Sequence, residues 1–156
     1  MSGDHALGAA AVVIRDLSLD DLDAVLAIES VSFSTPWRRD TFEGLICRKD
    51  TDTLAAVHDD ILVGYAICWT VLDQSELGNV AVVQEVRGKG VGRQLVREAV
   101  ERVRRRGAKE CFLEVRVSNA GARKLYEEIG FTAIGTRRSY YREPIEDALV
   151  MRVELS

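Results

Sequence analysis

Cysteine is scarce in this chain and forms no pattern. The 156 residues include three cysteines, Cys47, Cys68 and Cys111, which are isolated and lie in apolar stretches typical of a core. An odd number of separated cysteines argues against a disulfide framework or a zinc site. We therefore expect structural thiols, no bound metal and a reducing environment.

Long apolar runs are also absent. No stretch approaches the ~20 consecutive apolar residues that a membrane helix needs. Residues 1–11 lack the basic start and the apolar run of a signal peptide, and we expect them to be a disordered extension. The sequence therefore predicts a cytoplasmic protein without a membrane partner.

Neither sign of charge dominates. The chain has 21 basic and 25 acidic residues and a formal net charge of -4, so nothing predicts bulk binding to nucleic acid. No repeat, low-complexity tract or flexible linker is visible. With 47% hydrophobic residues, residues 12–156 are expected to form one domain around its own core. His5 and His58 lie in a terminus and a predicted turn, and neither is expected to be catalytic.

The first half of the chain is predicted to be rich in strands. Residues 12–17 are β-rich, and Ser18 with Asp21 forms a capping-box pattern that opens a helix. Thr35 and Pro36 give a second helix-start signal. Residues 53–57 and 61–72 are predicted strands joined by a tight turn at 58–60, and a third strand covers 76–83. Three strands in succession predict an antiparallel meander.

The second half alternates helices and strands. Apolar residues at helical spacing predict a helix that ends at Gly107, and a second helix is predicted to end at Gly130. Strands are predicted at 111–115, 131–137 and 148–154. This order predicts an α/β (α+β mixed) fold, in which a mixed, mostly antiparallel sheet of about six to seven strands carries helices on both faces.

A glycine-rich turn is the sharpest local feature. It lies between a predicted strand and a predicted helix, where glycines let the backbone approach a ligand and free helix N–H groups suit a phosphate. The spacing matches neither a P-loop nor the dinucleotide fingerprint. A purely structural connection remains the alternative. The turn consists of Arg87, Gly88, Lys89, Gly90, Val91, Gly92 and Arg93.

The pattern Arg-x-x-Gly-x-Gly at 87–92 resembles the acetyl-CoA pyrophosphate loop of the GCN5-related N-acetyltransferase (GNAT) family. Residues 113–120 (Leu-Glu-Val-Arg-Val-Ser-Asn-Ala) and 125–131 (Leu-Tyr-Glu-Glu-Ile-Gly-Phe) resemble the second half of its core. Within the family, the residues at 33–37, 113–119, 137–141 and 146–148 are most similar to RimI-type enzymes, which acetylate the N-terminal alanine of a ribosomal protein. Residues 83–85 (Val-Gln-Glu) depart from the family pattern, which often has an acidic residue and a proline there.

The resemblance implies which residues hold the cofactor. Backbone groups of Val80, Ala81 and Val82 would contact the pantetheine arm of acetyl-CoA, and an N–H near Val82 would stabilise the oxyanion, an effect worth ~3 kcal/mol at comparable sites. From composition alone, this segment is equally well a core strand. Asn119 is a local helix-cap candidate, and its cofactor contact is implied by the resemblance alone.

Glu114 and Tyr126 are the expected catalytic pair. Glu114 lies within an apolar run, where an unpaired carboxylate is costly, and the family pattern implies a general base. The alternative is an exposed strand end or an ion pair with an arginine. Tyr126 is on the apolar stripe of its helix and would be a core aromatic on composition alone. The resemblance implies instead that it protonates the departing thiolate.

Four aromatic residues are expected to hold the substrate. Phe33, Trp37, Tyr140 and Tyr141 fall in the two segments that flank the peptide groove in the family. Packing of loops is the alternative. Arg137 and Arg138 are predicted to be solvated or ion-paired.

The resemblance implies transfer of an acetyl group from acetyl-CoA to a protein N-terminus, and its RimI-type part implies the N-terminal alanine of a small-subunit ribosomal protein as the substrate. Two alternatives within this reading are a GNAT enzyme for lysine side chains or small amines and a non-catalytic acetyl-CoA-binding module. A third is an unrelated nucleotide-binding protein that uses the glycine turn. The sequence leaves the oligomeric state open between a monomer and a weak dimer.

Overall fold

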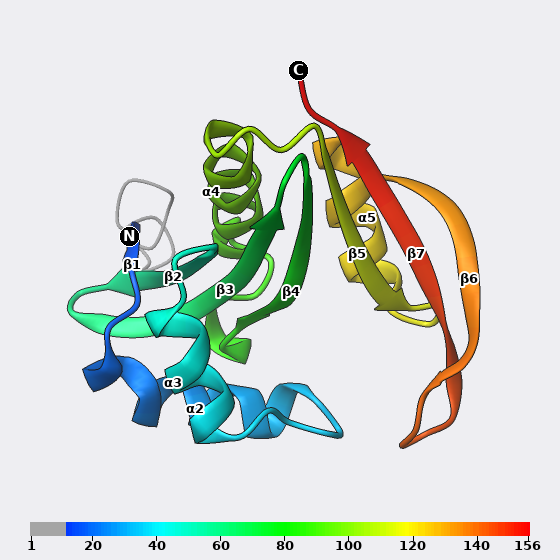
Figure 1. Cartoon of the computed structure of the whole chain (residues 1–156). Coiled ribbons are helices and arrows are strands. Elements are labelled where there is room, and N and C mark those ends of the chain that lie inside the picture. The colour runs from blue at the N-terminus through cyan, green and yellow to red at the C-terminus, as the bar shows by residue number, and fades with distance from the viewer. Residues whose placement is uncertain (1–11) are drawn as a thin grey trace.

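The computed structural model describes residues 12–156, so the expected extension at 1–11 lies outside the described residues. One seven-stranded sheet runs through the described chain in the order β1-β2-β3-β4-β5-β7-β6 (Figure 1). All neighbouring strands are antiparallel except β4 and β5, which are parallel. The strands are β1 (Val12–Asp16), β2 (Thr51–His58), β3 (Ile61–Val71), β4 (Gln74–Val82), β5 (Glu110–Arg116), β6 (Thr132–Tyr141) and β7 (Glu146–Glu154).

Helices cover both faces of the sheet, and two hydrophobic cores result. The helices are α2 (Leu22–Ser32), α3 (Arg39–Cys47), α4 (Val91–Arg105) and α5 (Ala120–Ile129), with 3₁₀ segments η2 (Leu19–Asp21) and η3 (Gln84–Val86). Because side chains alternate along a strand, Leu54 and Ala56 pack on the α4 side while Ala55 packs beneath α2 and α3. The predicted mixed, mostly antiparallel sheet with helices on both faces is confirmed (Figure 1).

Several local predictions are confirmed by backbone geometry. The backbone N–H of Ser18 donates to the carboxylate of Asp21 at 2.8 Å, so the capping box forms and opens η2, which leads directly into α2. Asp59 and Asp60 have φ angles of 50° and 63°, as expected for a two-residue hairpin turn between β2 and β3. Gly130 ends α5 with a φ of 119°, a conformation that glycine adopts without strain.

The predicted helix start at Thr35 and Pro36 is wrong. α3 begins only at Arg39, after a loop that spans residues 33–38. The loop is held by a contact back to the preceding helix, because the backbone N–H of Trp37 donates at 2.8 Å to the carboxylate of Glu29 on α2. A cap followed by proline is a local signal, whereas in the structure residues 35–37 belong to a loop that is bonded to α2, and Arg38 is the N-cap of α3.

Two further expectations need correction. Cys47 is exposed at the end of α3, whereas Cys68 and Cys111 are buried as expected, and all three thiols are free. The last two strands are longer than predicted, since β6 reaches Tyr141 and β7 begins at Glu146. A register shift between Arg137 and Tyr141 interrupts their pairing.

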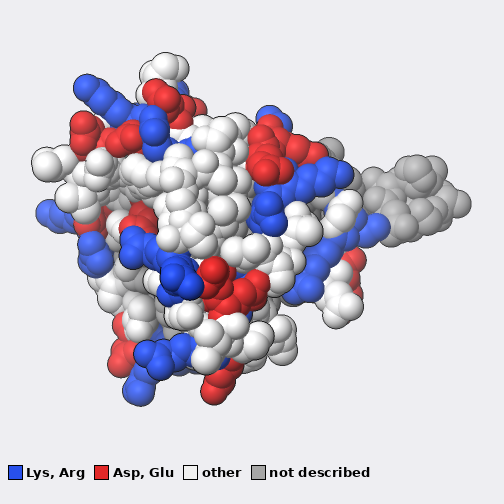
Figure 2. Space-filling view, turned by 90° about the vertical axis from the view of Figure 1, so that its right-hand side faces the viewer, with Lys and Arg blue, Asp and Glu red and all other residues white. Residues whose placement is uncertain are grey.

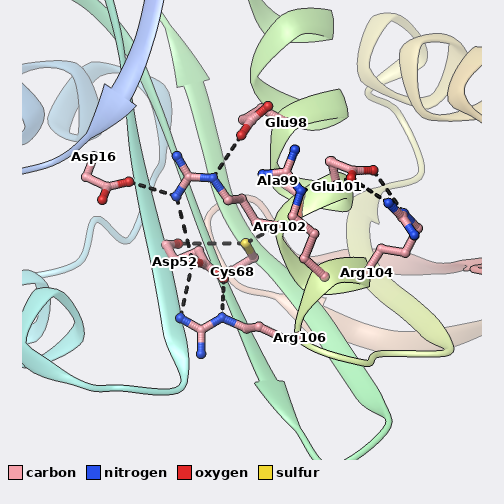
Figure 3. Close-up of polar contacts among 10 residues, drawn as sticks. Asp16, Asp52, Cys68, Glu98, Ala99, Glu101, Arg102, Arg104 and Arg106 are labelled. Atoms are coloured by element: carbon pink, nitrogen blue, oxygen red, sulfur yellow. Dashed lines mark hydrogen bonds and ion pairs between the residues drawn. The ribbon is translucent and has the colours of Figure 1, made fainter.

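Ion pairs fasten α4 to the first two strands (Figure 3). Arg102 donates to Asp16 of β1 at 2.7 Å and to Glu98 of its own helix at 2.8 Å. Arg106, just beyond the helix, donates at 2.6 Å to Asp52 of β2, which is 9% exposed. This network fixes the C-terminal end of α4 against β1 and β2, far from the glycine-rich turn at its beginning.

Charges of both signs are interspersed on the face drawn in Figure 2, which is the side of the molecule that carries β6. No helix among residues 12–156 has the length and apolar character needed to cross a membrane.

Candidate active site

The site is organised by the separation of β4 and β5. These strands pair only from Gln74 to Glu76 on β4 and from Glu110 to Phe112 on β5, and their remaining residues are not paired with each other. Figure 1 shows the two strands spreading apart beyond the paired ends. Two cavities lie beside this separation; β4 contributes residues to both of them, and β5 contributes residues to the smaller one.

The larger cavity, of about 640 Å³, is bounded by the last residues of α2, the end of β4, the glycine-rich turn and α5. It collects most of the residues expected to bind the cofactor. Lys89 and Val91 are the exceptions, and Val91 is 1% exposed because it packs into the core. The expected cofactor residues that line the cavity are Val80, Ala81, Val82, Arg87, Gly88, Gly90, Gly92, Arg93 and Asn119.

The glycine-rich turn presents the N-terminus of α4 to this cavity. Gly88 and Gly90 have φ angles of 79° and 87°, and Gly90 is the N-cap of this 15-residue helix. A Cβ at either position would meet no atom within 4 Å, so backbone conformation, not crowding, requires glycine there. The first-turn N–H groups of a helix have no acceptor within it and lie at its positive end, which suits a phosphate or diphosphate.

Polar side chains around the larger cavity also fit such a ligand. The Arg87 side chain donates to the carbonyl oxygen of Val82 at 3.1 Å, which ties the turn to the end of β4. Asn119 accepts from the backbone N–H of Ala122 at 3.2 Å, so its predicted role as helix cap is confirmed. The buried hydroxyl oxygen of Ser32 has no hydrogen-bond partner among residues 12–156, although it belongs to a residue that lines the cavity.

Tyr126 lines the same cavity from α5. Its ring packs edge-on against Phe131, with 5.8 Å between the ring centroids. Burial raises the pKa of its hydroxyl to about 12. Tyr126 is thus a phenol that keeps its proton throughout the neutral range and can donate it.

The smaller cavity, of about 310 Å³, contains Glu114 of β5. The carboxylate forms an ion pair with Arg137 of β6 and accepts a hydrogen bond from the hydroxyl of Tyr140. Its side chain is 16% exposed, so it combines substantial burial with access to the cavity. The arginine pairing anticipated as an alternative role is therefore present. The role as general base stays a prediction.

Comparisons with known proteins agree with this geometry. Residues 21–131 match the family model described as the acetyltransferase (GNAT) family. The chain is 37% identical to the [ribosomal protein bS18]-alanine N-acetyltransferase of Salmonella typhimurium, over 92% of this chain and 97% of that protein. The chain belongs to the GNAT family. It is accordingly an N-acetyltransferase.

Solved structures show the same fold. The crystal structure of the ribosomal-protein-S18-alanine N-acetyltransferase from Escherichia coli is 33% identical, covers 93% of this chain and 94% of its own, and aligns with a TM-score of 0.85. The NatC complex bound to Gag peptide and CoA is 23% identical and aligns with a TM-score of 0.84 over 93% of this chain and 99% of its own. At that identity, the likeness to NatC shows the GNAT fold alone.

Of the four predicted substrate aromatics of this GNAT chain, Phe33 lines a cavity, whereas Trp37, Tyr140 and Tyr141 line neither of the two. Phe33 lines the larger cavity, whereas Trp37 is half-buried against Phe42 and Trp69 at centroid distances of 5.5 and 6.5 Å. The rings of Tyr140 and Tyr141 on β6 pack against each other, with 5.1 Å between their centroids. Their substrate roles remain predictions.

Tyr141 connects the two catalytic candidates electrostatically. Burial, followed by the nearby charge of Glu114, raises the pKa of Tyr141 to about 12, and Tyr126 also contributes. The guanidinium of Arg116 lies 4.4 Å from the centroid of the Tyr141 ring and opposes this shift. Glu114 and Tyr126 therefore both raise the pKa of Tyr141, although they line different cavities.

A second carboxylate, Glu76, lies in the smaller cavity and was not predicted from the sequence. It lies at the point where β4 leaves β5, and the indole of Trp69 donates a hydrogen bond to it. Burial, followed by the charge of Glu114, raises the pKa of Glu76. A carboxylate in the predicted strand 76–83 was an available signal, but its proximity to Glu114 depends on a contact between residues 38 positions apart. Two carboxylates beside one arginine make this cavity suitable for a cationic amine.

Replacing Glu76 by glutamine is expected to stabilise the protein near pH 7. A carboxyl whose pKa is raised by folding penalises the folded state when it is ionised, and the penalty vanishes below the unfolded pKa of ~4.3. We expect the variant to raise Tm by about 1–3 °C at pH 7 and by nothing at pH 4. Thermal unfolding of both proteins between pH 4 and pH 7 tests this prediction. An equal rise in Tm at pH 4 and at pH 7 would contradict it.

Proposed function

We propose that this GNAT chain transfers the acetyl group of acetyl-CoA to the N-terminal amine of a protein, and that its substrate is the N-terminal alanine of a small-subunit ribosomal protein in the cytoplasm. The observation that carries the proposal is the near full-length similarity to enzymes named for bS18-alanine acetylation. The smaller cavity, which contains the carboxylates of Glu76 and Glu114, and the neighbouring larger cavity support it.

The larger cavity fits acetyl-CoA. The free N–H groups at the start of α4 would bind its diphosphate, with Arg87 and Arg93 nearby on the turn. Val80 to Val82 would offer backbone groups to the pantetheine arm and to the thioester carbonyl. This arrangement would bring the thioester close to Tyr126 and to the separation between β4 and β5.

The proposed chemistry is direct transfer within a complex of enzyme and both substrates. The Glu114 carboxylate accepts a proton from the substrate ammonium through water, and the freed amine attacks the thioester carbon. A C–N bond forms, the C–S bond breaks, and Tyr126 gives its proton to the departing thiolate. The nitrogen, which carries one excess proton after the C–N bond forms, releases it to water to leave a neutral amide, and the Tyr126 phenolate regains a proton from water. A backbone N–H near Val82 would stabilise the oxyanion.

The chemistry favours an α-amine over a lysine side chain. The reference pKa of an α-amine is ~7.8, whereas that of lysine is ~10.4, so the N-terminus is far easier for a carboxylate to deprotonate near neutral pH. The two cavity carboxylates, Glu76 and Glu114, would also attract the ammonium before it loses its proton.

The proposal predicts which amine is modified. The protein is incubated with acetyl-CoA and short peptides beginning with Ala-Arg, Ser or Met, each with a free or a blocked N-terminus, and the added acetyl group is located by mass spectrometry. We expect acetylation only at free N-termini and fastest on alanine. Modification of lysine in blocked peptides would favour the side-chain alternative. Acetyl-CoA binding without transfer to any amine would favour a non-catalytic module.

A further inference from the structure

Glu29 of α2 is a buried carboxylate that the proposed chemistry does not use. It is 1% exposed and lines neither cavity. Three residues from three different segments donate hydrogen bonds to it. They are Trp37 of the 33–38 loop through its backbone N–H (2.8 Å), Asn79 of β4 through its amide (2.9 and 3.0 Å), and Tyr65 of β3 through its hydroxyl.

These donors are all uncharged. Among residues 12–156, the structure shows no ion pair between Glu29 and a basic side chain. Burying an unpaired carboxylate costs free energy, which several good hydrogen bonds offset in part. A neutral residue of similar size would avoid that cost. Both carboxylate oxygens are needed, however, to accept from three directions at once.

Two residues that donate to Glu29, Trp37 and Asn79, lie where the ring of Trp69 packs on β4 beside the smaller cavity. Gly78 precedes Asn79, and a Cβ there would lie only 2.6 Å from the ring of Trp69 and 3.1 Å from that of Trp37. The two indoles therefore pack directly on the β4 backbone. Trp69 in turn lines the smaller cavity and donates a hydrogen bond to Glu76.

The same carboxylate also holds the 33–38 loop, which begins at Phe33 in the larger cavity. One group thus links that loop to the part of β4 that immediately precedes Val80 to Val82. Without it, the N–H of Trp37 and the amide of Asn79 would lose a common acceptor. The position of the loop relative to β4 would then be less well determined.

We infer that Glu29 is a positioning residue that fixes the acceptor side of the cleft by tying the 33–38 loop to β4. The inference rests on the proposed function, because it takes the loop and the smaller cavity as the binding site of the amine. Glu29 acts through Trp37, Trp69 and Asn79, and it does not touch the reacting atoms.

Glu29→Gln tests this role, because a positioning residue should affect KM for the peptide much more than kcat. The amide keeps the size of the side chain but replaces one acceptor oxygen by an NH₂ group that faces donors. We expect KM for the peptide to rise about tenfold, while the Kd of acetyl-CoA stays within about twofold and kcat within about threefold. Equal changes in peptide KM and in kcat would overturn the inference. A fall in Tm with no change in peptide KM would also overturn it.

Asp52→Asn is the matched control. Asp52 is also a buried carboxylate with several hydrogen bonds, but its partner is Arg106 and it lines neither cavity (Figure 3). Its replacement should lower Tm and leave both substrate constants unchanged. A rise in peptide KM in this variant would mean that general loosening of the fold produces the effect, which removes the specific role of Glu29.

Tyr65→Phe covers the case in which Glu29→Gln does not fold. The change removes one donor and keeps the ring that packs edge-on against Phe42 at 5.9 Å. A rise of about threefold in peptide KM is expected. Hydrogen exchange provides a measurement independent of activity: the amide of Trp37 should exchange at least about tenfold faster in either variant, with residues 110–116 unchanged.

These measurements separate the two hypotheses. If the unaltered protein acetylates no peptide, the proposed function fails, and the exchange of the Trp37 amide still decides whether Glu29 holds the loop. If peptides are acetylated but neither variant changes peptide KM or Trp37 exchange, the role of Glu29 is wrong and the proposed function stands.

Discussion

Replacing Tyr126 by phenylalanine is expected to lower kcat by about 10²-fold or more, since general acid catalysis by a positioned side chain typically contributes 10²–10⁴-fold. The ring remains, so its packing against Phe131 and the shape of the larger cavity should persist. The departing thiolate would then have to take its proton from water. Steady-state kinetics with saturating acetyl-CoA and peptide measures the loss.

The accompanying binding and pH data identify the cause. The Kd of acetyl-CoA should change by less than about twofold, because the hydroxyl acts only as the C–S bond breaks. Burial raises the pKa of Tyr126 to about 12, so the residue keeps its proton at every pH up to about 10 and the shape of the pH profile should survive the substitution. Unchanged kcat would remove Tyr126 from the mechanism, and greatly weakened acetyl-CoA binding would make it a binding residue.

Local patterns were sufficient to predict most of the secondary structure. The apolar stripe of α4 includes Leu95, Val96 and Ala99, which are all at most 1% exposed. The helical spacing of these apolar residues in the sequence arises because one face of the helix is buried. Gly107 and Gly130 have positive φ angles where the helices were predicted to stop. In these segments the conformation depends on neighbours in the sequence, which is why residue spacing predicts it.

The parts that could not be predicted depend on contacts between distant segments. The loop before α3 is held by the bond from Trp37 to Glu29, and no pattern at 35–38 records this acceptor. Similarly, Glu114 of β5 meets Glu76 and Arg137 only because the sheet places β4 on one side of β5, and β7 followed by β6 on the other. The family resemblance identified Glu114 and the glycine turn, but it gave no indication of the second carboxylate or of the Glu29 contacts.

Replacing Glu114 by glutamine is expected to reduce acetylation most strongly at low pH. Below the α-amine pKa of ~7.8 the substrate is an ammonium that needs a base, whereas above it an increasing fraction is already a free amine. We expect kcat/KM for the peptide to fall by about 10²–10³-fold at pH 6 and by much less at pH 9. The pH dependence of kcat/KM, measured for both proteins with an alanine peptide, tests this prediction.

Glu110→Gln is the matched control for that experiment. Glu110 belongs to the same strand and its carboxylate is paired with Arg152 at 2.9 Å, but it does not line the smaller cavity. The control therefore makes the same chemical change on β5 and also removes an arginine partner. It should retain activity at every pH, because only a carboxylate that reaches the amine can accept its proton. A parallel loss in both variants, or a loss in Glu114→Gln that does not vary with pH, would mean that Glu114 supports the strand through Arg137 and is not the base.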